Sequence, residues 1–277
     1  MGILPAPYSR DAAWALLFPA YDRWRVHDLP GMLAEVRRVL DSEPLVKGSE
    51  RDAFLNIAVA MSMTLGRLHE ARDLAQRMFG DQLREVQLAV VADAVDDFDA
   101  VRTHLSRFPR QNDGRPLRYV RAGLYKQAAE ILAIPGFRAG PNAEAALAQL
   151  DIRSGRRTEA IERLRKAIAS ARRNRLSERY LAAELLATQL QRSHRPDEAI
   201  KVLEEAAADE PVYTTTGMSG AYWLRVLGRL IREYRALGRY EDAEAKERQL
   251  RGLLALADAD HPLVLQLEHS PTSLRMP

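Results

Sequence analysis

The sequence repeats a short phrase in which a glycine precedes an alanine by five residues. The phrase stands at residues 66–71, 123–128, 155–160 and 238–243, and a fifth copy at 194–199 has histidine in place of glycine. Glycine ends a helix readily because it adopts a positive φ without a Cβ penalty. An acidic side chain before the alanine suits the first turn of a following helix. Each copy therefore predicts a helix end, a tight turn and a new helix.

Two weaker copies extend the pattern to other parts of the chain. Met32 and Ala100 stand there in the place of the alanine, and the seven anchors are separated by 28 to 44 residues. The segments beside the turns have helical periodicity, as at Ile161, Leu164 and Ile168. This arrangement predicts helix pairs over residues 9–43, 49–79, 81–108, 115–134, 142–173, 176–210 and 219–257.

These pairs define the expected fold class, which is all-α: an α-solenoid of about seven antiparallel helix pairs. We expect it to be elongated, because a solenoid repeat contacts only its neighbours. The predicted organisation is a lead at 1–8, less regular repeats at 9–134, more regular repeats at 142–257, a cap at 258–268 and a flexible tail at 269–277.

The spacing around the anchors resembles that of tetratricopeptide repeat (TPR) proteins. In that family a large residue follows the anchoring alanine by four positions, a small one by seven and proline by twelve. Ala199 is followed by Leu203, Ala206 and Pro211 in this way. The match is good over 142–257, fair over 20–79 and poor around 81–134. There His104 and Arg107 occupy the positions of the large and the small residue after Ala100.

The resemblance implies a superhelix whose first helices line a concave groove. Residues about 7, 8, 11, 15 and 18 positions before each anchor follow one helical stripe that faces the groove. The candidate ligand-binding residues on this stripe are Asn142, Gln149, Arg153, Thr188, Gln191, Arg192, Arg225, Arg232 and Arg235. Guanidinium groups bind carboxylates in bidentate fashion, so the expected partner is a protein or peptide segment that is acidic or carries a C-terminal carboxylate. The alternatives are a solvated groove and a groove filled by another helix.

The leading hypothesis is therefore a non-enzymatic protein–protein interaction scaffold. The last repeat, from residue 237 to residue 262, also resembles the end of TPR tails on bacterial eukaryotic-like Ser/Thr kinases and related regulators. This second resemblance implies the alternative function, a regulatory or sensor region that acts on a bacterial signalling kinase or transcription regulator.

The sequence contains no constellation typical of catalysis or of metal binding. Cysteine is absent, the six histidines are scattered, and neither a phosphate loop nor a nucleophile elbow is present. We expect no enzyme activity, no cofactor and no metal.

Charge and hydropathy restrict the partners and the location. The formal net charge is +3, and no aromatic residues alternate with the arginines, so nucleic acid is an unfavourable partner. The longest runs without charge are 14 residues, shorter than the about 20 that cross a bilayer. We expect a cytoplasmic protein with no membrane partner.

Two stretches of the chain carry opposite charge. Residues 153–179 carry +7 and residues 81–100 carry −5. Solvated outer faces are one interpretation and a patch for an acidic partner is the other.

Four aromatic residues gather near the N-terminus, at Trp14, Phe18, Tyr21 and Trp24. Their helical spacing favours the core of the first pair, and an exposed docking end is the alternative.

Overall fold

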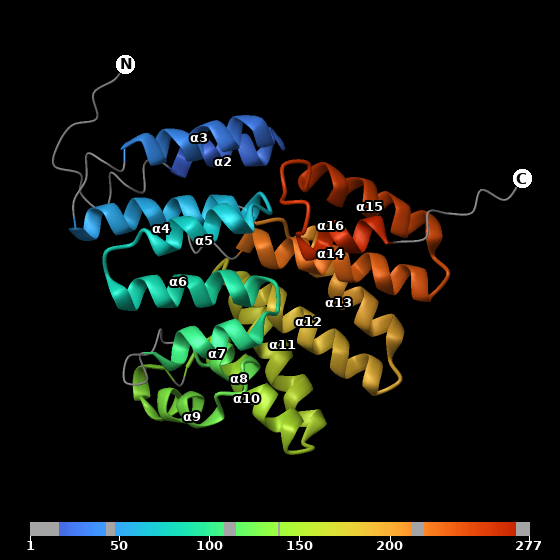
Figure 1. Cartoon of the computed structure of the whole chain (residues 1–277). Coiled ribbons are helices and arrows are strands. Elements are labelled where there is room, and N and C mark those ends of the chain that lie inside the picture. Colours follow the sequence, from blue (N-terminus) through green and yellow to red (C-terminus); the bar gives the residue numbers. More distant parts are fainter. Residues whose placement is uncertain (1–16, 43–47, 108–114, 138, 212–218, 270–277) are drawn as a thin grey trace, which may run out of the picture.

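The computed structural model describes residues 17–42, 48–107, 115–137, 139–211 and 219–269, which form helices and the turns between them (Figure 1). The helices are α2 (Leu17–Arg25), α3 (Leu29–Ser42), α4 (Gly48–Thr64), α5 (Leu68–Gln76), α6 (Asp81–Ala94), α7 (Phe98–Ser106), α8 (Pro116–Arg121), α9 (Tyr125–Ala133), the 3₁₀ helix η2 (Pro135–Phe137), α10 (Pro141–Arg153), α11 (Arg157–Arg173), α12 (Glu178–Arg192), α13 (Pro196–Ala208), α14 (Ser219–Ala236), α15 (Tyr240–Leu253) and α16 (Pro262–Glu268).

The predicted fold class is confirmed for the described residues. The α-helices from α2 to α15 form seven antiparallel pairs, and the members of each pair pack against one another (Figure 1). Within the predicted cap, α16 packs on α14 and α15. The lead at 1–8 and residues 270–277 of the predicted tail lie outside the described residues, whereas His269 ends α16.

The turns have the backbone conformation that the repeated phrase predicts. Gly66 has a φ of 72°, and the backbone N–H of Arg67 donates to the carbonyl of Ser62 at 2.8 Å. This bond from the residue after the glycine closes a Schellman motif and satisfies a helix-end carbonyl. His194 takes the glycine position of the fifth copy with a φ of 58°.

His194 therefore occupies a conformation that a non-glycine residue adopts at a cost. We expect His194→Gly to raise the free energy of unfolding by about 0.5–1 kcal/mol. Gly155→Ala is the matched opposite change, because Gly155 has a φ of 78° and open space around its Cα. It should lower stability by about 1 kcal/mol. Urea unfolding midpoints measure both changes, and equal midpoints for the two variants would contradict this account of the turns.

The third pair follows a register that differs by one residue from the predicted one. The left-handed residue is Asp96, with a φ of 60°, so the fifth residue after it is Val101 rather than Ala100. Val101 is completely buried and Ala100 is half-buried. In this register buried Leu105, not His104, is the large residue that follows the anchor by four. The prediction failed because aspartate also tolerates a positive φ, so no glycine marks the turn.

Two of the alanine anchors in residues 142–257 are completely buried. Ala160 and Ala199 have no exposed surface, and neither do Leu164 and Leu203, four positions after them. The small anchor permits close approach of the two helices, and the leucine fills the space between them.

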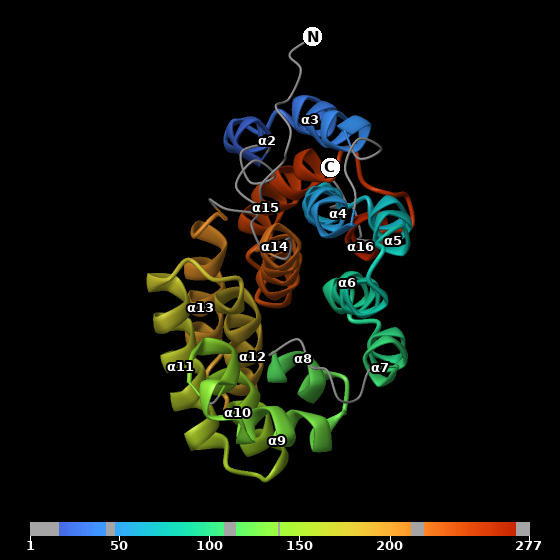
Figure 2. The same ribbon diagram turned by 90° about the vertical axis from the view of Figure 1, so that its left-hand side faces the viewer.

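The array is not a linear solenoid, and the expectation that each pair touches only its neighbours is wrong. Figure 2 shows that the array curls until its last helices lie beside its first, which gives a ring. Helix α14 packs against α4 and α12, and Trp24 of α2 meets Trp223 of α14 edge to face, with ring centroids 6.1 Å apart. A Cβ at Gly220 would lie 2.6 Å from the Thr64 side chain. Glycine at this position therefore permits the approach of α14 to α4, which the repeat pattern did not reveal.

The aromatic residues of the first pair divide between core and surface. Tyr21 and Trp24 are buried, as the core interpretation predicts, whereas Phe18 is 60% exposed. Trp14 lies outside the described residues. No helix in the described ranges has both the length and the apolar character needed to cross a membrane.

Candidate binding site at the ring closure

A buried carboxylate lies at the point where α6, α8 and α14 meet. Asp93 is 1% exposed, and its Oδ1 accepts a hydrogen bond from Arg121 Nη1 at 2.6 Å. The hydroxyl of Tyr222 donates to Oδ2, and Arg118 Nε lies 3.7 Å from that oxygen. Burial alone would raise the pKa of Asp93, but Arg121 and Arg118 hold it below its usual value.

Arg225, one of the candidate ligand-binding residues, belongs to this network. Its Nη1 donates to Asp96 Oδ1 at 2.8 Å, and its Nη2 lies 3.0 Å from Glu184 Oε2. Burial would lower the pKa of Arg225, but these two carboxylates raise it above its usual value. The charge of Arg225 is therefore compensated within the chain, and this residue holds α14 to α6 and α12.

A pocket of about 240 Å³ lies beside Arg225, where both ends of the array meet. Its lining comes from α5, the end of α6, α12, α14 and α16: Leu68, Ala94, Val95, Asp96, Glu184, Ala221, Arg225, Arg232, His261, Pro262, Leu263 and Gln266.

Arg232 is the cation of this pocket without a compensating carboxylate. Its Nη1 donates to the neutral Gln266 Oε1 at 2.5 Å, and Gln266 Nε2 donates in turn to the carbonyl of Gly228 at 2.9 Å. No carboxylate among the described residues lies within 4.0 Å of its guanidinium. Burial and the nearby Arg229 lower the pKa of Arg232, while Glu184 and Glu233 act in the opposite direction.

His261 contributes a second donor to the pocket. The residue is buried, and burial lowers its pKa to about 4, so the imidazole is neutral at pH 7. Its Nδ1 accepts from the backbone N–H of Leu263 at 3.1 Å and caps α16. The ring proton of the neutral imidazole is therefore on Nε2.

Thr188 and Gln191 lie at the interface between α12 and α14, near Arg225. Arg229, which the sequence analysis did not select, donates to Thr188 Oγ1 at 2.8 Å and to Gln191 Oε1 at 3.2 Å. Gln191 also donates to Glu233. The structure thus joins these two candidates to the neighbouring helix of the same chain.

Asn142 and Arg235 are also bonded within the chain. Asn142 Oδ1 accepts from the backbone N–H of Leu117 at 3.0 Å, and Arg235 donates to Glu247.

The last three candidates, Gln149, Arg153 and Arg192, stand apart from the pocket. Gln149 is half-buried. Arg153 is exposed and stacks on the ring of Tyr125, with its Cζ 4.2 Å from the centroid. Arg192 is exposed, and its guanidinium contacts no carboxylate of the described residues.

Of the nine candidates, Arg225 and Arg232 line the pocket, Thr188 and Gln191 bond Arg229 between α12 and α14, and the other five lie elsewhere. His261 and Gln266 were missed because they lie on the cap. No local pattern in the sequence places α16 over α14.

Five of the ten basic residues in the basic stretch form ion pairs with described carboxylates. Arg163 Nε lies 2.8 Å from Asp151 Oδ2, and Arg172 Nη1 lies 3.5 Å from Glu205 Oε2. In the acidic stretch, Asp93 and Asp96 meet Arg121 and Arg225. Many charged side chains of these two stretches therefore form ion pairs between helices.

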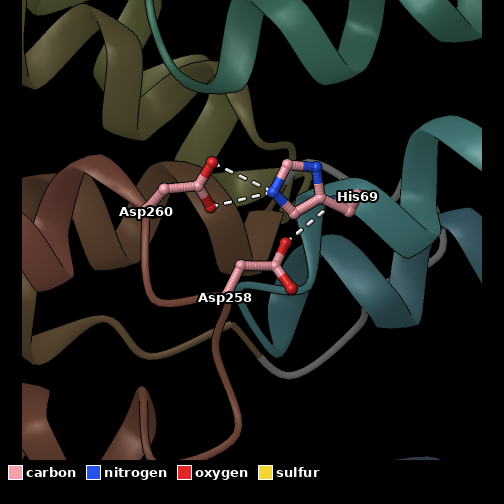
Figure 3. A group of neighbouring side chains, drawn as sticks. All are labelled: His69, Asp258 and Asp260. Carbon is pink, nitrogen blue, oxygen red and sulfur yellow. Dashed lines mark hydrogen bonds and ion pairs between the residues drawn. The ribbon is translucent and has the colours of Figure 1, made fainter.

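A further group of side chains joins the two ends of the array at the surface (Figure 3). His69 Nε2 lies 2.9 and 3.0 Å from the two carboxylate oxygens of Asp260, and the backbone N–H of His69 donates to Asp258 Oδ2 at 2.8 Å. Their ligand-type atoms lie within 4.8 Å of one another. The hydrogen bonds give these residues a structural role, because they tie the loop before α16 to the start of α5.

No protein-family model matches the chain, and no curated protein matches its sequence.

Proposed function

We propose that the protein is a non-enzymatic interaction scaffold that binds an acidic segment of another protein. The proposal rests on which of the five arginines among the candidate residues form ion pairs within the chain. Arg225 and Arg235 are neutralised by carboxylates of the same chain. Arg232 lines the separate pocket at the ring closure. Arg153 and Arg192 are exposed, and within the described ranges no carboxylate lies within 4.0 Å of them.

Two of these arginines occupy equivalent positions in consecutive repeats. Arg153 is the last residue of α10 and Arg192 the last residue of α12, seven positions before Ala160 and Ala199. The two helices pack together, and packed helix axes are about 8–10 Å apart. An extended peptide advances about 3.3 Å per residue, so two acidic side chains about three residues apart fit such a pair of cations.

Charge reversal tests this proposal. The partner is first captured from native cells and identified, and its affinity is then measured with purified protein. We expect Arg153→Glu combined with Arg192→Glu to weaken the complex at least about tenfold and to reduce its salt dependence. Helicity should be unchanged because neither guanidinium has a described carboxylate partner.

Arg248→Glu on α15 is the matched control, since Arg248 is also exposed and lies outside the predicted groove. It should bind like the wild type. Wild-type affinity in the double variant would show that these arginines do not form the binding surface.

A further inference from the structure

We propose that the pocket at the ring closure binds a small molecule with one anionic group, a carboxylate or a phosphate, and that this molecule bridges the two ends of the array. This site is separate from Arg153 and Arg192 and does not depend on the proposed function.

The first argument is charge. Arg225 forms ion pairs with Asp96 and Glu184 in the pocket wall, whereas the only described hydrogen bond of Arg232 is to the neutral Gln266. The carboxylates of Glu184 and Glu233 favour the charged form of Arg232, but burial and Arg229 outweigh them. A single anion beside Arg232 would supply the direct ion pair that no described carboxylate makes with this guanidinium.

The second argument is the geometry of the donors. Gln266 bonds one Nη of Arg232 and is itself fixed by the carbonyl of Gly228, so the guanidinium is held in place with other N–H groups free of described partners. His261 lines the same pocket with its protonated Nε2, for which the described residues provide no acceptor. A planar guanidinium and a neighbouring imidazole N–H are suited to an oxyanion with several acceptor oxygens.

The third argument is size. A volume of about 240 Å³ corresponds to about eight water molecules at ~30 Å³ each. It lies below the about 300–1,000 Å³ of sites for drug-sized ligands. Leu68, Val95 and Leu263 in the lining provide apolar contacts for the carbon skeleton of a small metabolite.

The fourth argument is that the residues lining the pocket come from both ends of the array. Leu68 and Val95 belong to the first half of the array, whereas Arg232 and Leu263 belong to its last repeat and cap. A molecule in the pocket contacts both ends of the ring. Its binding should therefore stabilise the closed ring in proportion to its concentration.

The experiment measures thermal unfolding of the full chain with sodium butyrate and, separately, with inorganic phosphate. Ionic strength is held constant with sodium chloride, which is also the reference. We expect at least one anion to raise the melting temperature in a saturable manner, and the one that does identifies the anionic group. Arg232→Gln should raise the apparent Kd of that anion at least about tenfold, while Arg232→Lys should retain part of the affinity.

The matched control is Arg192→Gln, which removes an exposed arginine outside the pocket and should leave the anion effect unchanged. Circular dichroism checks that Arg232→Gln retains its helices. The proposal is overturned if neither anion gives a saturable shift, or if Arg232→Gln responds like the wild type. Neither result bears on the acidic-segment complex, which is tested with Arg153 and Arg192.

Discussion

Asp93→Ala is expected to lower the free energy of unfolding by about 3–5 kcal/mol. The side chains of Arg118 and Arg121 are 3% and 6% exposed, and Asp93 is their shared buried carboxylate. Removing one partner of a buried ion pair leaves the other charge uncompensated in a medium of low dielectric constant. Tyr222 would lose the acceptor of its hydroxyl at the same time.

Chemical denaturation monitored by circular dichroism measures this change. Asp99→Ala is the matched control, because the side chain of Asp99 is 86% exposed and, among the described residues, pairs only with Arg102 at the surface. Its loss should cost less than about 1 kcal/mol. If the two variants lost similar amounts of unfolding free energy, the buried network would contribute no more to stability than a surface ion pair.

The same carboxylate gives the wild type a distinct pH dependence. The pKa of Asp93 is lowered from its ordinary value of 3.8 in the folded protein. Its contribution to stability is therefore complete above that value and is lost as the pH falls toward the folded-state pKa. Below about pH 3.8 the difference in unfolding free energy between the wild type and Asp93→Asn should shrink. A difference that grows as the pH falls would contradict the lowered pKa.

Local sequence patterns were sufficient to predict the helix pairs. Gly155 and Gly238 mark their turns because few other residues adopt a positive φ without strain. The third pair shows the limit of this signal. Asp96 makes the same turn without glycine, and the register was consequently placed one residue early, at Ala100 instead of Val101.

The ring closure could not be predicted in this way, because a repeat pattern describes only contacts between neighbours. Arg225 and Asp96 are 129 residues apart in the chain, and each has an ordinary position on its own helix. The stripe of candidate residues was a prediction about helix positions, and a stripe on one helix does not define what packs against it. Which arginines form ion pairs depends on long-range packing. Among the described residues, Arg225 forms ion pairs and Arg232 forms none.

Trp24→Ala is the second change with a large expected effect, about 3–5 kcal/mol of unfolding free energy. Trp24 is 1% exposed and meets the equally buried Trp223 at an interplanar angle of 82°. Edge-to-face pairs contribute about 0.5–1.5 kcal/mol beyond the burial of their area. Because the pair joins α2 to α14, we expect the loss to fall on the contact between the two ends of the array.

Hydrogen exchange and small-angle scattering locate the effect. Amides of α2 and α3 should lose protection in Trp24→Ala, and the radius of gyration should rise as the ring opens. Phe18→Ala on the same helix is the control, since Phe18 is 60% exposed and its removal should change stability by less than about 0.5 kcal/mol. A variant that keeps the wild-type radius and protection would show that Trp24 does not hold the ring closed.

The Trp24 variant also connects ring closure with the pocket. Trp24 does not line the pocket, yet the walls of the pocket come from both ends of the array. If an anion at Arg232 stabilises the closed ring, then opening the ring at α2 must weaken the binding of that anion, because coupling between two equilibria is reciprocal. We therefore expect the apparent Kd of the anion to rise in Trp24→Ala and to remain at the wild-type value in Phe18→Ala. An unchanged Kd in an opened ring would mean that the pocket is complete without closure.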